Sequence, residues 1–168
     1  MSGRTSRNLF ETPEEIPDSV TSSLDAILVL GGGLPLSVDE PPVFVQKRCD
    51  DAAKVVQHHA TLKKTTTTTS STSTSLPILC LSAGTAHLPQ LLGPDGLPIW
   101  ESTASSAYLL KHYSNILQPA QIFVETTSYD TIGNAFYART SFTDINGWRK
   151  LLIITNEVRD SFAVLFPL

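Results

Sequence analysis

Four short, mainly apolar runs divide the chain into sections. They fall within residues 25–30, 78–82, 121–125 and 151–155. A continuous apolar run of this length, without polar alternation, is typical of a strand buried on both faces, as in a parallel sheet. We therefore predict four buried strands.

Between these runs, three segments place apolar and small residues at helical spacing. The clearest stripe consists of Val45, Cys49, Ala52, Ala53, Val56 and Ala60. It predicts a helix over 45–60, and similar spacing predicts helices over 101–113 and 130–142, the last with Asp130 as N-cap. Alternating strands and helices indicate an α/β fold with right-handed crossovers and a mostly parallel sheet of about four strands.

The chain after the fourth strand is short for this fold class. Residues 156–168 hold one further apolar run, 162–166, which fits either half a helix or an edge strand. Doubly wound domains usually have five or six strands. We therefore expect the domain to be incomplete at its C-terminus.

Two segments lack any periodic pattern. Residues 1–24 are polar and contain Pro13 and Pro17, so we expect a flexible N-terminal arm. An unbroken Ser/Thr tract predicts a disordered insertion over 64–75, because it has no apolar side chain to bury; a phosphorylated linker is the alternative. Since a long surface insertion costs little loop-closure entropy, residues 25–168 are expected to form one domain.

Composition excludes several classes of protein. A net charge of −4 gives no basic face for nucleic acid, and no apolar run approaches the ~20 residues that span a bilayer. Cys49 and Cys80 lie within apolar patterns and are expected to be buried reduced thiols. We expect a soluble, cytoplasmic protein whose partner is a small molecule, while the pattern specifies no cofactor and no metal.

Candidate chemistry lies in the loops that follow the strands, because ligands of such sheets bind at the carboxyl ends of the strands. Gly31, Gly32 and Gly33 follow the first strand. They match neither the dinucleotide fingerprint nor the P-loop. A glycine turn still lets backbone amides approach an anion, although a simple tight turn is the alternative.

The loop after the second strand carries hydroxyls and an imidazole. Ser82 and Thr85 are expected to line a pocket, and His87 follows them. Glu101 begins the next helix, so Glu101 and His87 could serve acid–base chemistry or hold a metal. The alternatives are that Glu101 only complements the helix N-terminus and that His87 is a solvated loop residue.

Residues 125–134 form the densest polar stretch of the chain, where the third strand leads into the third helix. Its hydroxyls, two acids and amide exceed what helix capping requires, so we interpret it as functional, with elaborate capping as the alternative. The candidate ligand-binding residues here are Ser128, Thr131 and Asn134. Asp130 joins Glu101 as a candidate catalytic carboxylate.

Together these segments resemble the YdcF-like family, and most closely its soluble eukaryotic branch. The resemblance covers 25–155 through the pieces 25–33, Arg48, 81–85 with His87, 101–103, 128–135 and 148–155. It implies a Rossmann-like three-layer α/β sandwich whose motif residues gather at the carboxyl edge of the sheet. The residues that it assigns to this site are Gly32, Gly33, Arg48, Ser82, Glu101, Ser128, Thr131 and Asn134.

The resemblance also implies a class of ligand. Phosphate-bearing or nucleotide-like small molecules are the substrates suggested for the family. This chain departs from the family after the fourth strand. The family has a His-Met-x-Arg-like motif there, whereas residues 156–160 contain no histidine. An enzyme that acts on such a molecule is our first hypothesis. The alternatives are a non-catalytic binding module, and a truncated and impaired paralogue or gene-model artefact.

Overall fold

The computed structural model describes residues 8–66, 75–156 and 161–167. At its centre, four parallel strands lie side by side in the order β6-β3-β2-β7. Their bounds are Ala26–Leu30 for β2, Ile78–Leu81 for β3, Ile122–Val124 for β6 and Lys150–Asn156 for β7. The predicted α/β class and Rossmann-like sandwich are confirmed.

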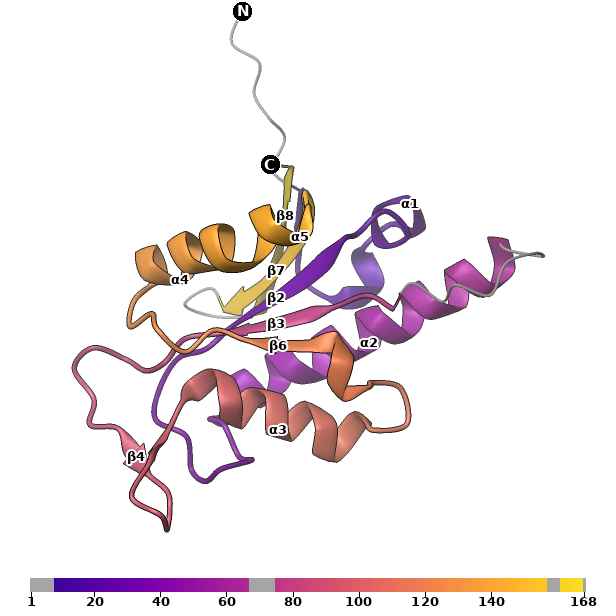
Figure 1. Cartoon of the computed structure of the whole chain (residues 1–168). Helices are drawn as coiled ribbons and strands as arrows, with labels where there is room; N and C mark the ends of the chain where they lie inside the picture. The colour runs from indigo at the N-terminus through magenta and orange to yellow at the C-terminus, as the bar shows by residue number, and fades with distance from the viewer. Residues whose placement is uncertain (1–7, 67–74, 157–160, 168) are drawn as a thin grey trace, which may run out of the picture.

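Helices cover both faces of this sheet (Figure 1). On one face lie α2 (Val43–Thr66) and α3 (Glu101–Tyr113), and on the other lies α4 (Thr131–Ala138). The order of the parallel strands reverses between β2 and β7, which is the switch point where doubly wound folds bind ligands.

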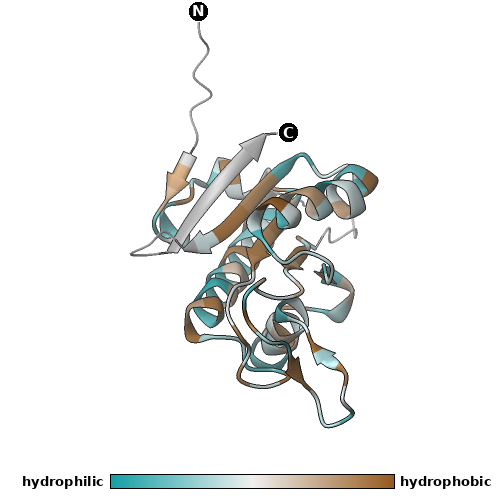
Figure 2. Ribbon diagram, turned by 90° about the vertical axis from the view of Figure 1, so that its left-hand side faces the viewer, coloured by the Kyte–Doolittle hydropathy of each residue, from teal (hydrophilic) through white to brown (hydrophobic). Residues whose placement is uncertain are grey.

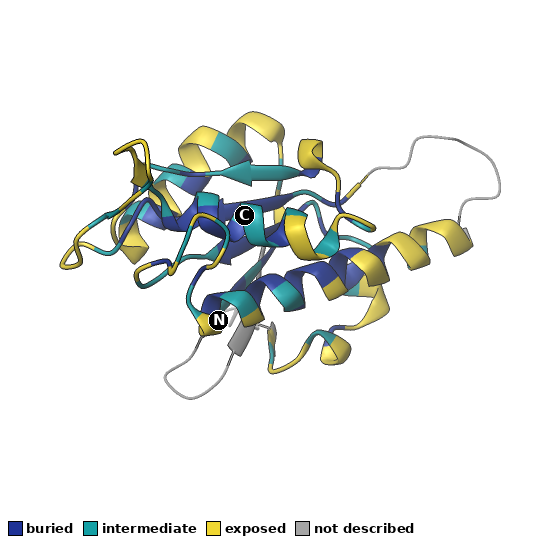
Figure 3. Cartoon of the chain, turned by 90° about the horizontal axis from the view of Figure 1, so that it is seen from below, coloured by how far each residue is buried: buried dark blue, intermediate teal, exposed yellow. Residues whose placement is uncertain are grey.

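Successive side chains of a strand point to opposite faces of the sheet. Because helices cover both faces, both sets of side chains are buried. Ile27 and Val29 of β2 belong to the core under α2 and α3, whereas Ala26 and Leu28 belong to the core under α4. Figure 2 shows the hydrophobic strands at the centre of the molecule, and Figure 3 shows that the most deeply buried residues lie there. This two-sided burial explains why each strand is a continuous apolar run.

The sheet extends beyond its parallel part on the β7 side. There β8 (Ser161–Pro167) pairs antiparallel with β7, and β1 (Asn8–Phe10) pairs antiparallel with β8. Of the two possibilities for 162–166, the structure has the strand. Asp25 links the start of β2 to the start of β7, because its Oδ2 accepts hydrogen bonds from the amides of Arg149 and Lys150 at 2.7 and 2.8 Å.

The N-terminal segment differs from the flexible arm expected over 1–24. Residues 1–7 lie outside the described part, but 8–24 contain β1, a 3-10 turn η1 (Pro13–Glu15) and α1 (Asp18–Thr21). Ile16 and Leu24 are only 4% and 6% exposed. These elements are too short to produce a periodic pattern, yet their isolated apolar residues pack against the domain, so the prediction of a flexible arm is wrong for them.

Helix boundaries also differ from the predicted ones. α2 begins at Val43 and ends at Thr66, so the first residues of the expected insertion are helical, while 67–74 lie outside the described residues. α3 has the predicted bounds. The expected helix over 130–142 is α4 followed by a π-helical turn, η3 (Arg139–Thr143), and α5 (Asp144–Asn146).

The remaining described elements are short. β4 (Leu91–Leu92) and β5 (Pro98–Ile99) form a small hairpin in the loop after β3, and η2 (Pro119–Gln121) leads into β6. Cys49 and Cys80 are both free and fully buried, as predicted. Burial raises the pKa of the Cys80 thiol to about 12. Within the described parts of the chain, no helix combines the length and the apolar character needed to cross a membrane.

Candidate functional site

The loops after β2, β3 and β6 meet at the carboxyl edge of the sheet, beside the switch point. They bring most of the predicted site residues into two neighbouring groups. The first, which we call the glycine-turn site, consists of Gly31, Gly32, Gly33, Arg48, Thr85 and Glu101. The second, which we call the Glu125 clamp, consists of Ser82, Glu125, Thr127, Ser128 and Asn134.

The glycine turn needs glycine for two different reasons. Gly31 is packed so closely that an added Cβ would lie 2.5 Å from the carbonyl oxygen of Leu81 and 2.9 Å from Glu101 Oε2. Gly32 and Gly33 instead have φ angles of 153° and 78°, which side-chain-bearing residues rarely adopt. The turn is therefore held close against β3 and the start of α3.

Arg48 projects from α2 to the back of this turn. Its Nη1 donates hydrogen bonds to the carbonyl oxygens of Leu30 and Gly31, at 2.5 and 2.9 Å. The guanidinium also lies 5.3 Å from the centre of the Phe44 ring. Burial lowers the pKa of Arg48, and the negative charge of Glu101 acts in the opposite direction. Arg48 thus places a positive charge behind the turn while holding its carbonyls.

Glu101 lies at the start of α3 and is only 4% exposed. Its Oε1 accepts a hydrogen bond from Thr85 Oγ1 at 2.8 Å, and the same hydroxyl accepts one from the Gly33 amide at 3.1 Å. Glu101 Oε2 is buried and has no hydrogen-bond partner among the described residues. The carboxylate at the N-terminus of α3 is thus also bonded to the loop after β3, while its second oxygen is held without a donor beside Gly31.

Ser82 has an unusual backbone conformation for a residue with a side chain. Its φ angle is 93°, although it is buried between β3 and the loop that follows. Its hydroxyl donates to the Gly84 carbonyl at 3.1 Å, and its amide donates to Glu125 Oε2 at 3.3 Å. Non-glycine residues in sparsely populated backbone regions occur preferentially at functional sites. No feature of the sequence indicates this conformation.

Glu125 lies in the polar stretch 125–134 that the sequence analysis interpreted as functional, but it was not among the named candidate residues. It directly follows β6, is 2% exposed, and accepts hydrogen bonds from the amides of Thr127 and Ser128 as well as Ser82. The Ser128 hydroxyl lies between Glu125 Oε2 and Asn134 Oδ1, within hydrogen-bonding distance of both. The signal in the sequence that could have identified Glu125 is an acidic residue directly after an apolar strand. Glu125 ties the loops after β3 and β6 together.

Asp130 is confirmed as the N-cap of α4. Its Oδ1 accepts a hydrogen bond from the Gly133 amide at 2.6 Å, and the side chain is exposed. Thr131, in the first turn of the same helix, is exposed too. His87 is also exposed and makes no hydrogen bond with the described residues. The backbone carbonyl of Asp130 accepts a hydrogen bond from the Asn134 amide at 2.9 Å, but among the described residues no side-chain hydrogen bond joins Asp130, Thr131 or His87 to either group.

The two groups are joined through Ser82. An added Cβ on Gly31 would lie 2.8 Å from the Ser82 Cβ, and the Ser82 carbonyl accepts a hydrogen bond from the Ser102 amide at 2.9 Å. Arg48 and Glu101 thus contact the glycine turn, whereas Asn134 belongs to the clamp through Ser128. Among the described residues, no group of three or more His, Cys, Asp or Glu could hold a metal ion.

Comparisons with known proteins leave the family open. No protein-family model, no curated protein and no solved structure matches the chain.

Proposed function

We propose that the glycine-turn site binds a phosphate- or nucleotide-bearing small molecule and that the protein is an enzyme that acts on it. The observation that carries this proposal is the buried Glu101 Oε2 without a donor, beside the turn. A buried acceptor without a partner costs about 1–3 kcal/mol. Such groups in folded proteins call for an explanation, and a hydroxyl of a bound ligand or of a water molecule would complete the hydrogen bond.

Each residue of the site would have a separate role. The glycine turn allows the backbone to approach a phosphate closely. Arg48 Nη1 already donates to the Leu30 and Gly31 carbonyls. Arg48 would therefore act on the anion through its positive charge rather than through this nitrogen. Glu101 would accept a proton from the ligand hydroxyl or from water as general base, while Thr85 holds its other oxygen in place.

The resemblance to the YdcF-like family supports the same assignment, and we propose membership of that family. Gly32, Gly33, Arg48 and Glu101, which the resemblance places at the site, lie around one turn. Ser82, Ser128 and Asn134 lie in the adjoining clamp.

A non-catalytic binding module is the second candidate, and one observation favours it. The other acids of this edge already serve the backbone, since Glu125 binds loop amides and Asp130 caps α4. Glu101 would then be the one buried carboxylate of the described edge with an oxygen that lacks a hydrogen-bond donor. A single such group suits recognition of a hydroxyl without requiring turnover.

Calorimetric titration with nucleoside monophosphates, nucleoside diphosphates and sugar phosphates tests both candidates. We expect at least one compound to bind, with about tenfold weaker binding to Glu101→Gln, because one charge-assisted hydrogen bond is lost. Glu14→Gln makes the same charge change outside the site and is the matched control. Product formation followed by phosphorus NMR supports the enzyme, and binding without turnover supports the module. If no compound of the three classes binds, or if Glu101→Gln binds like wild type, both candidates are wrong.

A further inference from the structure

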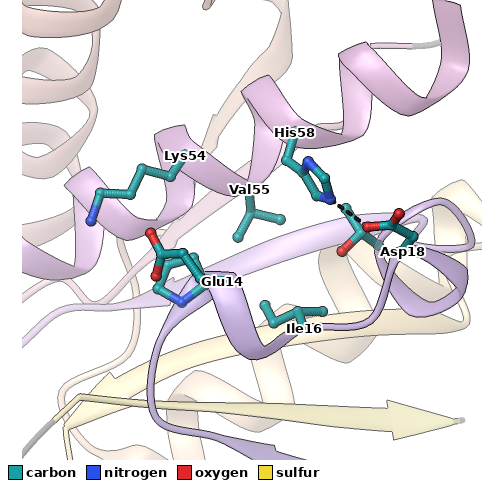
Figure 4. Close-up of a pocket in the computed structure, with 8 residues that line it drawn as sticks. Glu14, Ile16, Asp18, Lys54, Val55 and His58 are labelled. Carbon is teal, nitrogen blue, oxygen red and sulfur yellow. Dashed lines mark hydrogen bonds and ion pairs between the residues drawn. The ribbon is translucent and has the colours of Figure 1, made fainter. Parts of the chain in front are cut away.

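A second candidate site lies far from these loops along α2. There a pocket of about 330 Å³ opens between α2 and the N-terminal segment that contains η1 and α1 (Figure 4). One wall comes from Glu14, Ile16, Asp18 and Thr21, and the other from Lys54, Val55 and His58. None of these residues belongs to the glycine-turn site or to the Glu125 clamp.

The pocket has an apolar middle and charged ends. Ile16 and Val55, only 4% and 2% exposed, lie in the middle (Figure 4). Glu14 and Lys54 lie towards one end, and Asp18 and His58 towards the other. Lys54 and His58 are one helical turn apart on α2, a rise of about 6 Å. The two carboxylates of the N-terminal segment therefore lie on either side of a short apolar floor.

The unbalanced charge of the pocket is negative. Lys54 Nζ is paired with Asp51 Oδ1 at 3.1 Å, and His58 Nε2 lies 2.8 Å from Asp18 Oδ1. Glu14 forms no hydrogen bond or ion pair with any described residue. Its charge nevertheless acts on Lys54, whose pKa is raised mainly by the hydrogen bond to Asp51 and also by Glu14. A cationic group could bind Glu14 directly at one end, and the Oδ2 of Asp18 at the other without breaking the contact with His58.

Thr21 provides an independent indication of a ligand. It lines the pocket, is 1% exposed, and its Oγ1 has no hydrogen-bond partner among the described residues. Thr21 and Asp18 are three residues apart on α1, so they lie on the same face of that helix. A donor group bound at Asp18 is therefore positioned to satisfy the buried hydroxyl oxygen as well.

We propose that this pocket binds a short aliphatic diamine. One ammonium group bonds to Glu14, and the other bonds to Asp18 and to the hydroxyl oxygen of Thr21. The methylene chain between them lies over Ile16 and Val55, which removes apolar surface from water. Both ends of the ligand are matched by charge, and the middle is matched by the apolar floor.

Calorimetric titration with 1,4-diaminobutane tests the proposal, with butylamine and butyrate as probes of similar length. We expect the diamine to bind about tenfold more tightly than butylamine, which has one ammonium group, because one charge-assisted hydrogen bond is worth roughly that factor. Butyrate should not bind. Glu14→Gln and Asp18→Asn should each weaken diamine binding about tenfold. Glu11→Gln, which changes the charge outside the pocket lining, should leave it unchanged.

Thr21→Val separates ligand binding from folding. Valine keeps the shape of threonine and removes a hydroxyl that has no partner, so the melting temperature of the free protein should not fall, while diamine binding should weaken. The proposal is overturned if the diamine does not bind, if butyrate binds equally well, or if Glu14→Gln, Asp18→Asn and Thr21→Val all bind like wild type. Circular dichroism of each variant establishes that it is folded.

Discussion

Thr85 and Glu101 are joined by a hydroxyl that is used twice. Thr85 Oγ1 donates to Glu101 Oε1 and accepts from the amide of Gly33, so that the loop after β3 connects α3 to the glycine turn. The hydroxyl hydrogen is thereby committed to the carboxylate. This hydrogen bond fixes Glu101 Oε1, while Oε2 has no donor among the described residues.

Thr85→Val should break this connection. The Gly33 amide and Glu101 Oε1 would both lose a partner in a half-buried site, so we expect the free energy of unfolding to fall by about 1–2 kcal/mol. Urea denaturation measures the loss. Thr85→Ser keeps the hydroxyl and is the control; an equal loss in both variants would show that the methyl group, not the hydrogen bonds, stabilises the turn.

Gly31→Ala tests the close packing of the turn. Its Cβ would lie 2.5 Å from the backbone oxygen of Leu81, which cannot move without shifting β3. We expect a loss of about 2–3 kcal/mol, measured by urea denaturation. Gly147→Ala is the matched control, because Gly147 has a φ of 69° but open space around it, and it should lose only about 1 kcal/mol. A smaller loss for Gly31→Ala than for Gly147→Ala would contradict the packing argument.

The parallel core was predictable because burial on both faces leaves a distinct pattern in the chain. Strands such as β2 are short and continuously apolar, and α2 carries a long stripe. The segment 8–24 was not predictable, because its elements are three or four residues long and bury single side chains such as Ile16. A pattern needs several turns or several alternations before it can be recognised.

The site was predictable as a place but not as a set of contacts. Strand order brings the loops to one edge, so Arg48 and Glu101 could be expected there. Whether a polar side chain faces a ligand or the backbone depends on where the amides and carbonyls lie, which the sequence does not specify. Arg48 bonds carbonyls of the turn, and Glu125, which was not among the named candidate residues, binds amides of the neighbouring loops.

Glu125→Gln should destabilise the domain more than most single changes of charge. The amides of Thr127 and Ser128 now donate to Oε1 and the Ser82 amide donates to Oε2. Glutamine keeps only one of these oxygens, so its NH2 group would lie against donor groups at the other position. Hydrogen bonds to a charged group contribute about 1.5–3 kcal/mol, so we expect a loss of about 2–3 kcal/mol in thermal or urea unfolding.

Asp130→Asn is the control for Glu125→Gln, because it makes the same chemical change at an exposed carboxylate. Asparagine is as good an N-cap as aspartate, so its effect should be small. If the two variants unfold alike, Glu125 does not hold the loops together.

His59 should contribute to the pH dependence of stability. It is buried on α2, and burial, together with the nearby positive charge of Lys63, lowers its pKa below the ordinary value of 6.5. Between the lowered folded pKa and 6.5, the unfolded chain binds a proton that the folded chain does not. The stability that the neutral His59 contributes is therefore fully present above about pH 6.5 and is lost as the pH decreases towards the folded pKa.

His59→Leu removes the titrating group, so urea denaturation at several pH values between 7.5 and 5 should show a shallower decline of stability than in wild type. Identical slopes in wild type and His59→Leu would exclude His59 as a contributor.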